Sequence, residues 1–201
     1  MSSRNGSATE DGYKFKNMDL QVSLKKILKK GSLDTELEFQ RATIIDRQLR
    51  LLVKKNPSLT EERKRLRSIL KAYEDKYWIE EEINDEKVLE SEFAEHIAEL
   101  ENSFNLNRKQ VIRSVLKEKG LTQKELGRLL GHTSETHMSE LMNGVNPFTL
   151  SDLIVIHKLL NIGLDQLIPT TLSIQIINRL LTVISELKNP KLQYPMENLV
   201  A

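Results

Sequence analysis

The sequence predicts an all-α fold, and three observations support this prediction. Apolar residues recur every three or four positions along most of the chain, whereas the alternation typical of strands is absent. Three Ser/Thr-x-x-Glu/Asp motifs, which can form capping boxes at helix N-termini, open three of the apolar stretches. Aromatic residues make up 5% of the 201 residues and charged residues 29%, a composition that suits helices better than a β-sandwich.

The first part of the chain predicts a polar tail followed by two helices. Residues 1–17 are rich in Ser, Asn and Gly, and we expect them to be disordered. Helical spacing of apolar residues predicts a short basic helix over residues 20–30 and a longer helix over residues 35–54. Together with the elements that follow, they make residues 18–104 a helical N-terminal region.

A turn containing Pro57 should end the longer helix. Ser58 and Glu61 can form a capping box that begins the next helix, which we expect to continue to Tyr77. Two helices joined by so short a turn are expected to pack as an antiparallel hairpin.

Residues 80–101 are strongly acidic but keep an apolar stripe. They hold ten acidic side chains against one lysine, Lys87. Apolar residues at helical spacing from Val88 through Leu89 to Phe104 indicate an amphipathic helix rather than a disordered acidic tail. Two interpretations stay open, because the acidic face is either simply solvated or binds a basic partner.

Residues 122–144 predict two short helices joined by a tight turn. Thr122 and Glu125 form a capping box, and Gly131 can adopt the left-handed conformation that ends the first helix. Ser134 is placed to cap the second helix, and the Asn-Gly pair that follows should end it. A helix–turn–helix of this kind can place its second helix in the DNA major groove.

Three further helices complete a five-helix unit over residues 105–170. The first covers residues 108–119. A second begins at the capping box of Thr149 and Asp152, and a short third covers residues 164–168. The apolar positions expected to face the interior of the unit include Leu129, Ile154 and Leu159.

A final amphipathic helix is expected over residues 173–188, within a C-terminal segment that spans residues 171–201. Its apolar stripe, from Ile174 through Leu181 to Leu187, fits two interpretations. It packs against its own domain, or it pairs across the two-fold axis of a dimer.

Composition and charge exclude several classes of protein. The chain has no cysteine, which rules out disulfides, thiol catalysis and cysteine-based zinc sites. Its 30 basic and 29 acidic side chains give a net charge of +1, split as −2 over residues 1–104 and +3 over residues 105–201, which is too even to indicate a partner. The N-terminus lacks the apolar core of a signal peptide and no stretch approaches 18 apolar residues, so we expect a soluble, cytoplasmic protein.

Residues 107–168 resemble the Cro/phage-repressor-like (XRE) helix–turn–helix family. The similarity rests on five helices in succession, the segment GLTQKELGRLLG, a Ser-capped helix ending in NG, and the segment LSDLIVIHKLLNIGLDQLI. Gly127 stands where the family usually has Ala, and the turn GHTSE has one extra residue. The resemblance implies a lambda-repressor-like DNA-binding domain whose second motif helix reads the base sequence.

The longer turn resembles that of HigA-type antitoxins, and the N-terminal hairpin shows a looser similarity to the same family. There a Pro turn precedes a helix that ends in L-x-x-L-x-x-A-Y-E-x-x-H/Y, and the segment from Leu66 to Tyr77 resembles this pattern, with Ile69 at the second Leu position. The resemblance implies that the N-terminal region binds a basic RNase toxin encoded by a neighbouring gene. The residues expected to contact this partner are Tyr73, Tyr77, Glu92 and Glu95.

The residues expected to contact DNA lie on the two motif helices. Thr136 can contact a thymine methyl group, and His137 can donate a hydrogen bond to guanine. Gln123 and Asn143 match family positions that contact phosphates. The full expected set is Gln123, Lys124, Ser134, Glu135, Thr136, His137, Ser139, Glu140 and Asn143.

The predicted function is a sequence-specific DNA-binding transcriptional regulator, most specifically a HigA-like antitoxin that represses its own operon as a homodimer on double-stranded DNA. Two alternatives stay open: a phage- or host-type repressor without a toxin, and a protein-interaction adaptor derived from a helix–turn–helix. The second motif helix carries two acids and no Arg or Lys, which suits the adaptor. No enzymatic activity, cofactor or metal is expected, because paired carboxylates, nucleophile motifs and Gly-rich phosphate loops are absent.

Overall fold

The computed structural model describes residues 20–79, 83–172 and 174–192, and every regular element within these ranges is helical. The all-α prediction is therefore confirmed, while the expected disordered tail, residues 1–17, lies outside the described residues. After a helix over residues 20–30, the elements are α2 (Glu36–Val53), η1 (Pro57–Leu59), α3 (Thr60–Glu74), the π-helical η2 (Asp75–Ile79), α4 (Asp85–Glu118), α5 (Gln123–Leu129), α6 (Glu135–Met142), α7 (Leu150–Leu160), α8 (Leu164–Leu167), α9 (Ile174–Leu187) and η3 (Pro190–Leu192).

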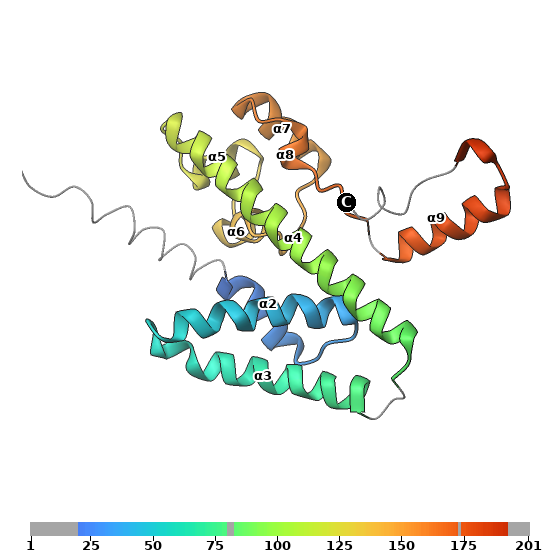
Figure 1. The fold of residues 1–201 in the computed structure, drawn as a ribbon. Helices are drawn as coiled ribbons and strands as arrows, with labels where there is room; N and C mark the ends of the chain where they lie inside the picture. Colours follow the sequence, from blue (N-terminus) through green and yellow to red (C-terminus); the bar gives the residue numbers. More distant parts are fainter. Residues whose placement is uncertain (1–19, 80–82, 173, 193–201) are drawn as a thin grey trace, which may run out of the picture.

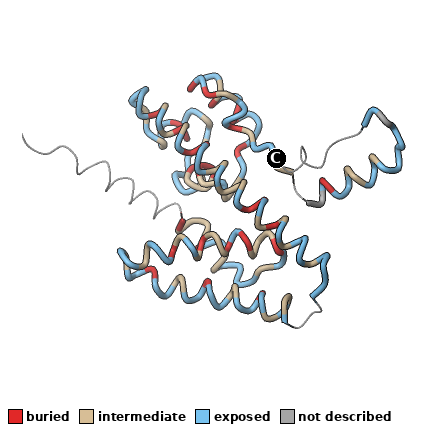
Figure 2. The backbone as a smooth tube through the Cα atoms, in the orientation of Figure 1, coloured by how far each residue is buried: buried red, intermediate tan, exposed pale blue. Residues whose placement is uncertain are grey.

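The N-terminal helices form one layer with its own core. Figure 1 shows α2 and α3 running antiparallel, with the helix over residues 20–30 beside them, so the expected hairpin is confirmed. Their inward residues share a single buried cluster (Figure 2). The members of this N-terminal core are Leu20, Leu24, Ala42, Ile45, Leu49, Leu59 and Leu66.

The start of α3 differs from the prediction. Asn56, not Ser58, caps the turn, because its Oδ1 accepts hydrogen bonds from the backbone N and the Oγ of Ser58 at 3.3 and 2.7 Å. This closes η1, and α3 then begins at Thr60, with no side-chain cap from Leu59. The predicted capping box of Ser58 and Glu61 is wrong because Ser58 already lies inside the preceding helical turn.

The helix α4 is continuous over 34 residues, a length of about 51 Å. The prediction of separate helices over residues 80–101 and 108–119 is therefore wrong, and the expected domain boundary at 104/105 lies inside this helix. The physical reason is that no Gly or Pro interrupts the segment between them, so the helix continues from the buried Ile97 and Ala98 to the buried Arg108 and Ile112.

The two halves of α4 serve different parts of the fold. Its first half packs on α2, beginning where the Oε1 of Glu36 accepts a hydrogen bond from the Oγ of Ser91 at 2.8 Å. Val88 and Leu89 precede this contact and are 39% and 65% exposed, although their spacing predicted an inward stripe. The second half of α4 enters the core of the C-terminal domain, so one continuous helix connects the N-terminal helices to that core (Figure 1).

The second half of α4 and the helices α5 to α8 enclose the second core, which is distinct from the first (Figure 2). Leu129, Ile154 and Leu159 were expected inside it, but they are 52%, 46% and 41% exposed, because α5 and α7 each cover it with one side only. The buried members are Ile112, Leu116, Leu126, Met138, Leu141, Met142, Phe148, Leu153, Ile156, Leu160, Ile162 and Leu167.

The helix α9 stands apart from both cores (Figure 1). Its stripe of apolar side chains is only partly covered, since Ile177 is 3% exposed whereas Leu187 is 59% exposed. The expected start of this helix, residue 173, lies outside the described residues.

Candidate DNA-binding site

Local hydrogen bonds fix where α5 and α6 begin. The Oγ1 of Thr122 accepts from the backbone N of Glu125 at 3.2 Å, and the Glu125 carboxylate accepts from the backbone N of Thr122 at 2.8 Å. The hydrogen bonds that the Glu125 carboxylate accepts from the backbone N and from the hydroxyl of Thr122 lower the pKa of Glu125. Gly131 adopts a φ of +82° after α5, and the Oγ of Ser134 accepts from the backbone N of His137 at 3.2 Å at the start of α6. The predicted caps of both motif helices are confirmed.

The core holds α6 from one side. Met138, Leu141 and Met142 are each no more than 2% exposed. Gly127 of α5 allows the two helices to approach closely, because a Cβ at this position would lie 3.4 Å from the Cγ of Met138. The opposite side of α6 is therefore the side left for a ligand.

Three expected base-contacting residues lie together at the N-terminal end of α6. Glu135 and Thr136 are exposed, and His137 is half-buried. The His137 ring meets the ring of His132 edge to face, with centroids 5.0 Å apart. This contact gives the His137 ring a defined direction.

The next residues of α6 bond within the domain. The Glu140 carboxylate accepts a hydrogen bond from Nδ2 of Asn146 at 2.8 Å. The Oγ of Ser139 accepts one from Nδ2 of Asn143 at 3.3 Å. Both residues thus hold the end of α6 against the loop that follows, which makes them poorer candidates for base contacts than Thr136.

An ion pair connects the N-terminal ends of the two motif helices. The Nζ of Lys124 lies 2.6 Å from an Oε1 of Glu135, and both side chains are well exposed. An exposed pair of this kind contributes little stability, about 0–1 kcal/mol. It does neutralise a carboxylate that would otherwise face DNA phosphates.

Two basic residues of α4 stand behind the expected phosphate contacts. The Nζ of Lys109 donates a hydrogen bond to Oδ1 of Asn143, and Nη2 of Arg113 lies 3.5 Å from Oε1 of Gln123. Burial and the neighbouring charge of Arg113 lower the pKa of Lys109 to about 7. Helical spacing indicates this burial, because Lys109 lies three residues before the buried Ile112 on the inward face of α4.

The residues expected to bind a protein partner lie far from this site, and most of them have contacts within the chain. Tyr73 is buried and its ring stacks between those of Phe39 and Tyr77, at centroid distances of 5.0 and 5.3 Å. It therefore supports the hairpin, and the expectation that it contacts a partner directly needs correction. Tyr77 donates through its hydroxyl to Glu90 at 3.0 Å.

The acidic face of α4 is also used within the chain. Glu95 lies 3.2 Å from Nη2 of Arg47, and Glu101 pairs with Arg41 at 2.7 Å, so α2 neutralises part of the acidic charge. Glu92 is exposed. Of the four expected partner residues, Glu92 is the one most open to solvent.

The elements from α4 to α8 together define a helix–turn–helix domain, in which α5 and α6 form the motif and the other three support it. Comparison with known families agrees, since a family model described as helix-turn-helix matches residues 112–167. The XRE/Cro-like resemblance is thus confirmed for this segment, and such a domain is typical of non-enzymatic, DNA-binding transcriptional regulators. Neither curated proteins nor solved structures give a match.

Two other features are absent from the residues that the structure describes. None of the helices within these residues is both long and apolar enough to cross a membrane. The same residues contain no group of three or more His, Asp or Glu side chains placed to hold a metal ion.

Proposed function

We propose that this protein binds a specific DNA sequence through α6 and acts as a transcriptional repressor. The observation that carries the proposal is the seating of α6, which is capped by Ser134 and held by the buried Met138 and Leu141 while it exposes Thr136. An exposed helix N-terminus on a rigid support is the arrangement with which helix–turn–helix proteins read the major groove.

The flanking residues are suited to contact the phosphates. Gln123 begins α5 and Asn143 follows α6, so both lie at ends of the motif helices. Lys109 and Arg113 hold these two side chains from behind. Contacts to phosphates fix the register of the protein on the duplex, and those of Thr136 with the bases provide specificity.

The experiment that tests this proposal separates the two kinds of contact. A duplex is first selected from a randomised pool by the full chain. Thr136→Ala combined with His137→Ala should weaken binding to the selected duplex by about 1–3 kcal/mol per lost contact and leave binding to a scrambled duplex unchanged. Gln123→Ala serves as the matched control, since it should weaken both equally. If the double variant bound the selected duplex as tightly as the wild type, the bases would not be read by this face.

We also propose that the protein binds DNA as a homodimer through α9. This helix leaves apolar side chains uncovered, and among them Leu187 is 59% exposed. Ile177 is already buried within the chain, so the contact would fall to Leu181, Ile184 and Leu187. Dimers of helix–turn–helix proteins read the two half-sites of a palindrome, and a contact between two α9 helices would hold two copies together for this.

A more specific proposal is that the protein is a HigA-like antitoxin. Its support is the resemblance of the N-terminal hairpin and the exposed carboxylates that α2 does not neutralise, such as Glu92. A basic RNase surface would be attracted to them, and the attraction would weaken as salt is added. The test is to co-express the full chain with the product of the neighbouring gene and to measure co-purification and growth. A neighbour that is not toxic, or that does not co-purify, removes this proposal.

The runner-up is a repressor without a toxin. The observation that favours it is the pairing of Arg41 and Arg47 of α2 with Glu101 and Glu95 of α4. These pairs give the acidic helix a role inside the chain, and no partner is then needed to explain its charge. The co-expression experiment distinguishes the two, because this alternative predicts full DNA binding and no effect of any neighbouring product.

A further inference from the structure

The basic helix over residues 20–30 contacts the segment that follows α6, the helix proposed to read the bases. The Nζ of Lys26 donates a hydrogen bond to the backbone carbonyl of Val145 at 3.3 Å, although the two residues are 119 positions apart. Val145 is two residues beyond Asn143, and its backbone N donates to the carbonyl of Glu140 at 3.0 Å. The bond therefore places Lys26 beside the C-terminal end of α6.

The apolar side of this helix is anchored in the N-terminal core. Leu20 and Leu24 are 8% and 0% exposed, and Ile27 and Leu28 pack against the same cluster. The helix consequently has one fixed face toward α2 and α3. Its opposite face is left for solvent or a ligand.

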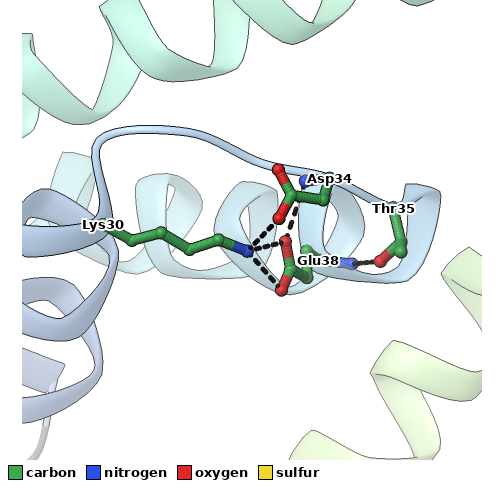
Figure 3. Close-up of polar contacts among 4 residues, drawn as sticks. All are labelled: Lys30, Asp34, Thr35 and Glu38. Carbon is green, nitrogen blue, oxygen red and sulfur yellow. Dashed lines mark hydrogen bonds and ion pairs between the residues drawn. The ribbon is translucent and has the colours of Figure 1, made fainter.

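A second contact fixes the direction of the helix where it leads into α2. Figure 3 shows the Nζ of Lys30 between two carboxylates, 2.9 Å from Asp34 and 2.7 Å from Glu38. Thr35 caps α2 in the same turn, accepting from the backbone N of Glu38 at 3.2 Å. These carboxylates raise the pKa of Lys30, chiefly through the hydrogen bond with Glu38. The ammonium group of Lys30 is thus already paired with the two carboxylates of this turn.

The other three lysines form a single charged face. Lys25, Lys26 and Lys29 are exposed, and positions three and four apart lie side by side on a helix. Among the ion pairs of the described residues, none joins any of the three to a carboxylate. The face carries three positive charges over about 6 Å of helix.

We propose that Lys25, Lys26 and Lys29 bind the phosphate backbone of DNA beside the end of α6, as an extension of the helix–turn–helix surface. This inference rests on the proposed DNA binding. One DNA strand carries a phosphate per about 3.4 Å of duplex axis, so a face of this length spans about two phosphates. The ammonium of Lys26 has three donors and can keep its bond to Val145 while it binds a phosphate oxygen.

The test measures how binding depends on salt. The full chain and its Lys25→Ala/Lys26→Ala/Lys29→Ala variant are titrated with the selected duplex and with a scrambled duplex between about 50 and 200 mM salt, a range over which phosphate contacts lose much of their affinity. We expect the slope of log K against log salt to fall in magnitude by about 2–3 for the variant. Affinity should fall equally for both duplexes, because phosphate contacts do not read sequence.

Two controls make the result decisive. The matched variant Lys64→Ala/Arg65→Ala/Arg67→Ala removes three exposed basic residues from α3, behind α2, and should leave the slope unchanged. The charge-preserving variant Lys25→Arg/Lys26→Arg/Lys29→Arg should retain the wild-type slope, and circular dichroism of all variants reports whether they fold.

The outcomes separate this inference from the proposal on which it rests. If the slope of log K against log salt fell by less than about one in the alanine variant, the inference would be overturned. The lysines would then only complement the dipole at the C-terminus of their own helix. An equal fall in the α3 control would also overturn it, since the effect would then follow net charge alone. Failure of the wild type to bind any duplex would instead remove the DNA-binding proposal, and this inference with it.

Discussion

The Nζ of Lys109 donates a hydrogen bond to Oδ1 of Asn143, linking the second half of α4 to the residue that follows α6. Lys109 is only 6% exposed, and burial lowers its pKa to about 7. Burying a charged side chain is costly, and the hydrogen bond to Asn143 offsets part of this cost for Lys109.

The low pKa of Lys109 predicts how stability changes with pH. The ordinary value is 10.5, so between about pH 7 and 10.5 the unfolded chain binds one proton more than the folded chain at this residue. The free energy of unfolding should therefore gain a positive slope with pH in this window, and the penalty for burying the charge is present in full below pH 7. Urea denaturation at pH 7, 8 and 9 should show this extra slope in the wild type and not in Lys109→Met. Parallel pH profiles for the two proteins would contradict the assignment.

Gly144 should be far less tolerant of alanine than Gly120. Both have a left-handed backbone, with φ of +69° and +68°, so each substitution should cost about 1–2 kcal/mol from strain. A Cβ on Gly144 would in addition lie 2.5 Å from the side chain of Asn105, whereas a Cβ on Gly120 meets nothing within 4 Å. Displacing Asn105 also disturbs its hydrogen bond from Arg108. Thermal unfolding should show a larger loss for Gly144→Ala, and equal losses would refute the contact.

Removing the carboxylate of Glu135 should strengthen non-specific binding to DNA. Glu135→Gln frees Lys124 from its ion pair and removes a negative charge from the face of α6. We expect the affinity for a scrambled duplex to rise and the salt slope to steepen by about one, because Lys124 can then neutralise a phosphate. Anisotropy titrations at several salt concentrations measure both. Glu118→Gln, which removes an exposed carboxylate at the end of α4, is the control and should have little effect.

Truncation before α9 should weaken the proposed dimer. Deleting residues 172–201 removes Leu181, Ile184 and Leu187, each of which can contribute about 1.5–3 kcal/mol if fully covered. Sedimentation velocity over a range of concentrations should show the truncated chain dissociating at a higher concentration than the full chain. Deleting only residues 193–201 leaves α9 in place and serves as the comparison. An unchanged dimer in the longer truncation would place the interface on another surface.

Helix caps and stops could be predicted from the sequence because each depends on a few neighbouring residues. The capping boxes of Thr122 and Thr149 form as expected. Residues at one helix end interact across three or four positions, and this range is visible in a sequence. The helix–turn–helix domain followed from such local signals.

The remaining features depend on contacts between distant parts of the chain. The bond from Lys109 to Asn143 spans 34 positions, and the bond from Lys26 to Val145 spans 119. No local pattern reports either of them. The continuity of α4 was not predicted, because the shift from acidic to mixed composition suggested a boundary between two helices. A change in charge does not end a helix when no Gly or Pro interrupts it.

The most direct test of sequence-specific binding compares two affinities of the full chain. Fluorescence anisotropy at about 150 mM salt should give the dissociation constants for the selected duplex and for a scrambled duplex of the same length. We expect the selected duplex to bind about 10³-fold more tightly or better, the usual ratio for specific recognition. Equal dissociation constants would contradict base reading by α6 and leave the helix–turn–helix as a DNA-binding module without sequence preference.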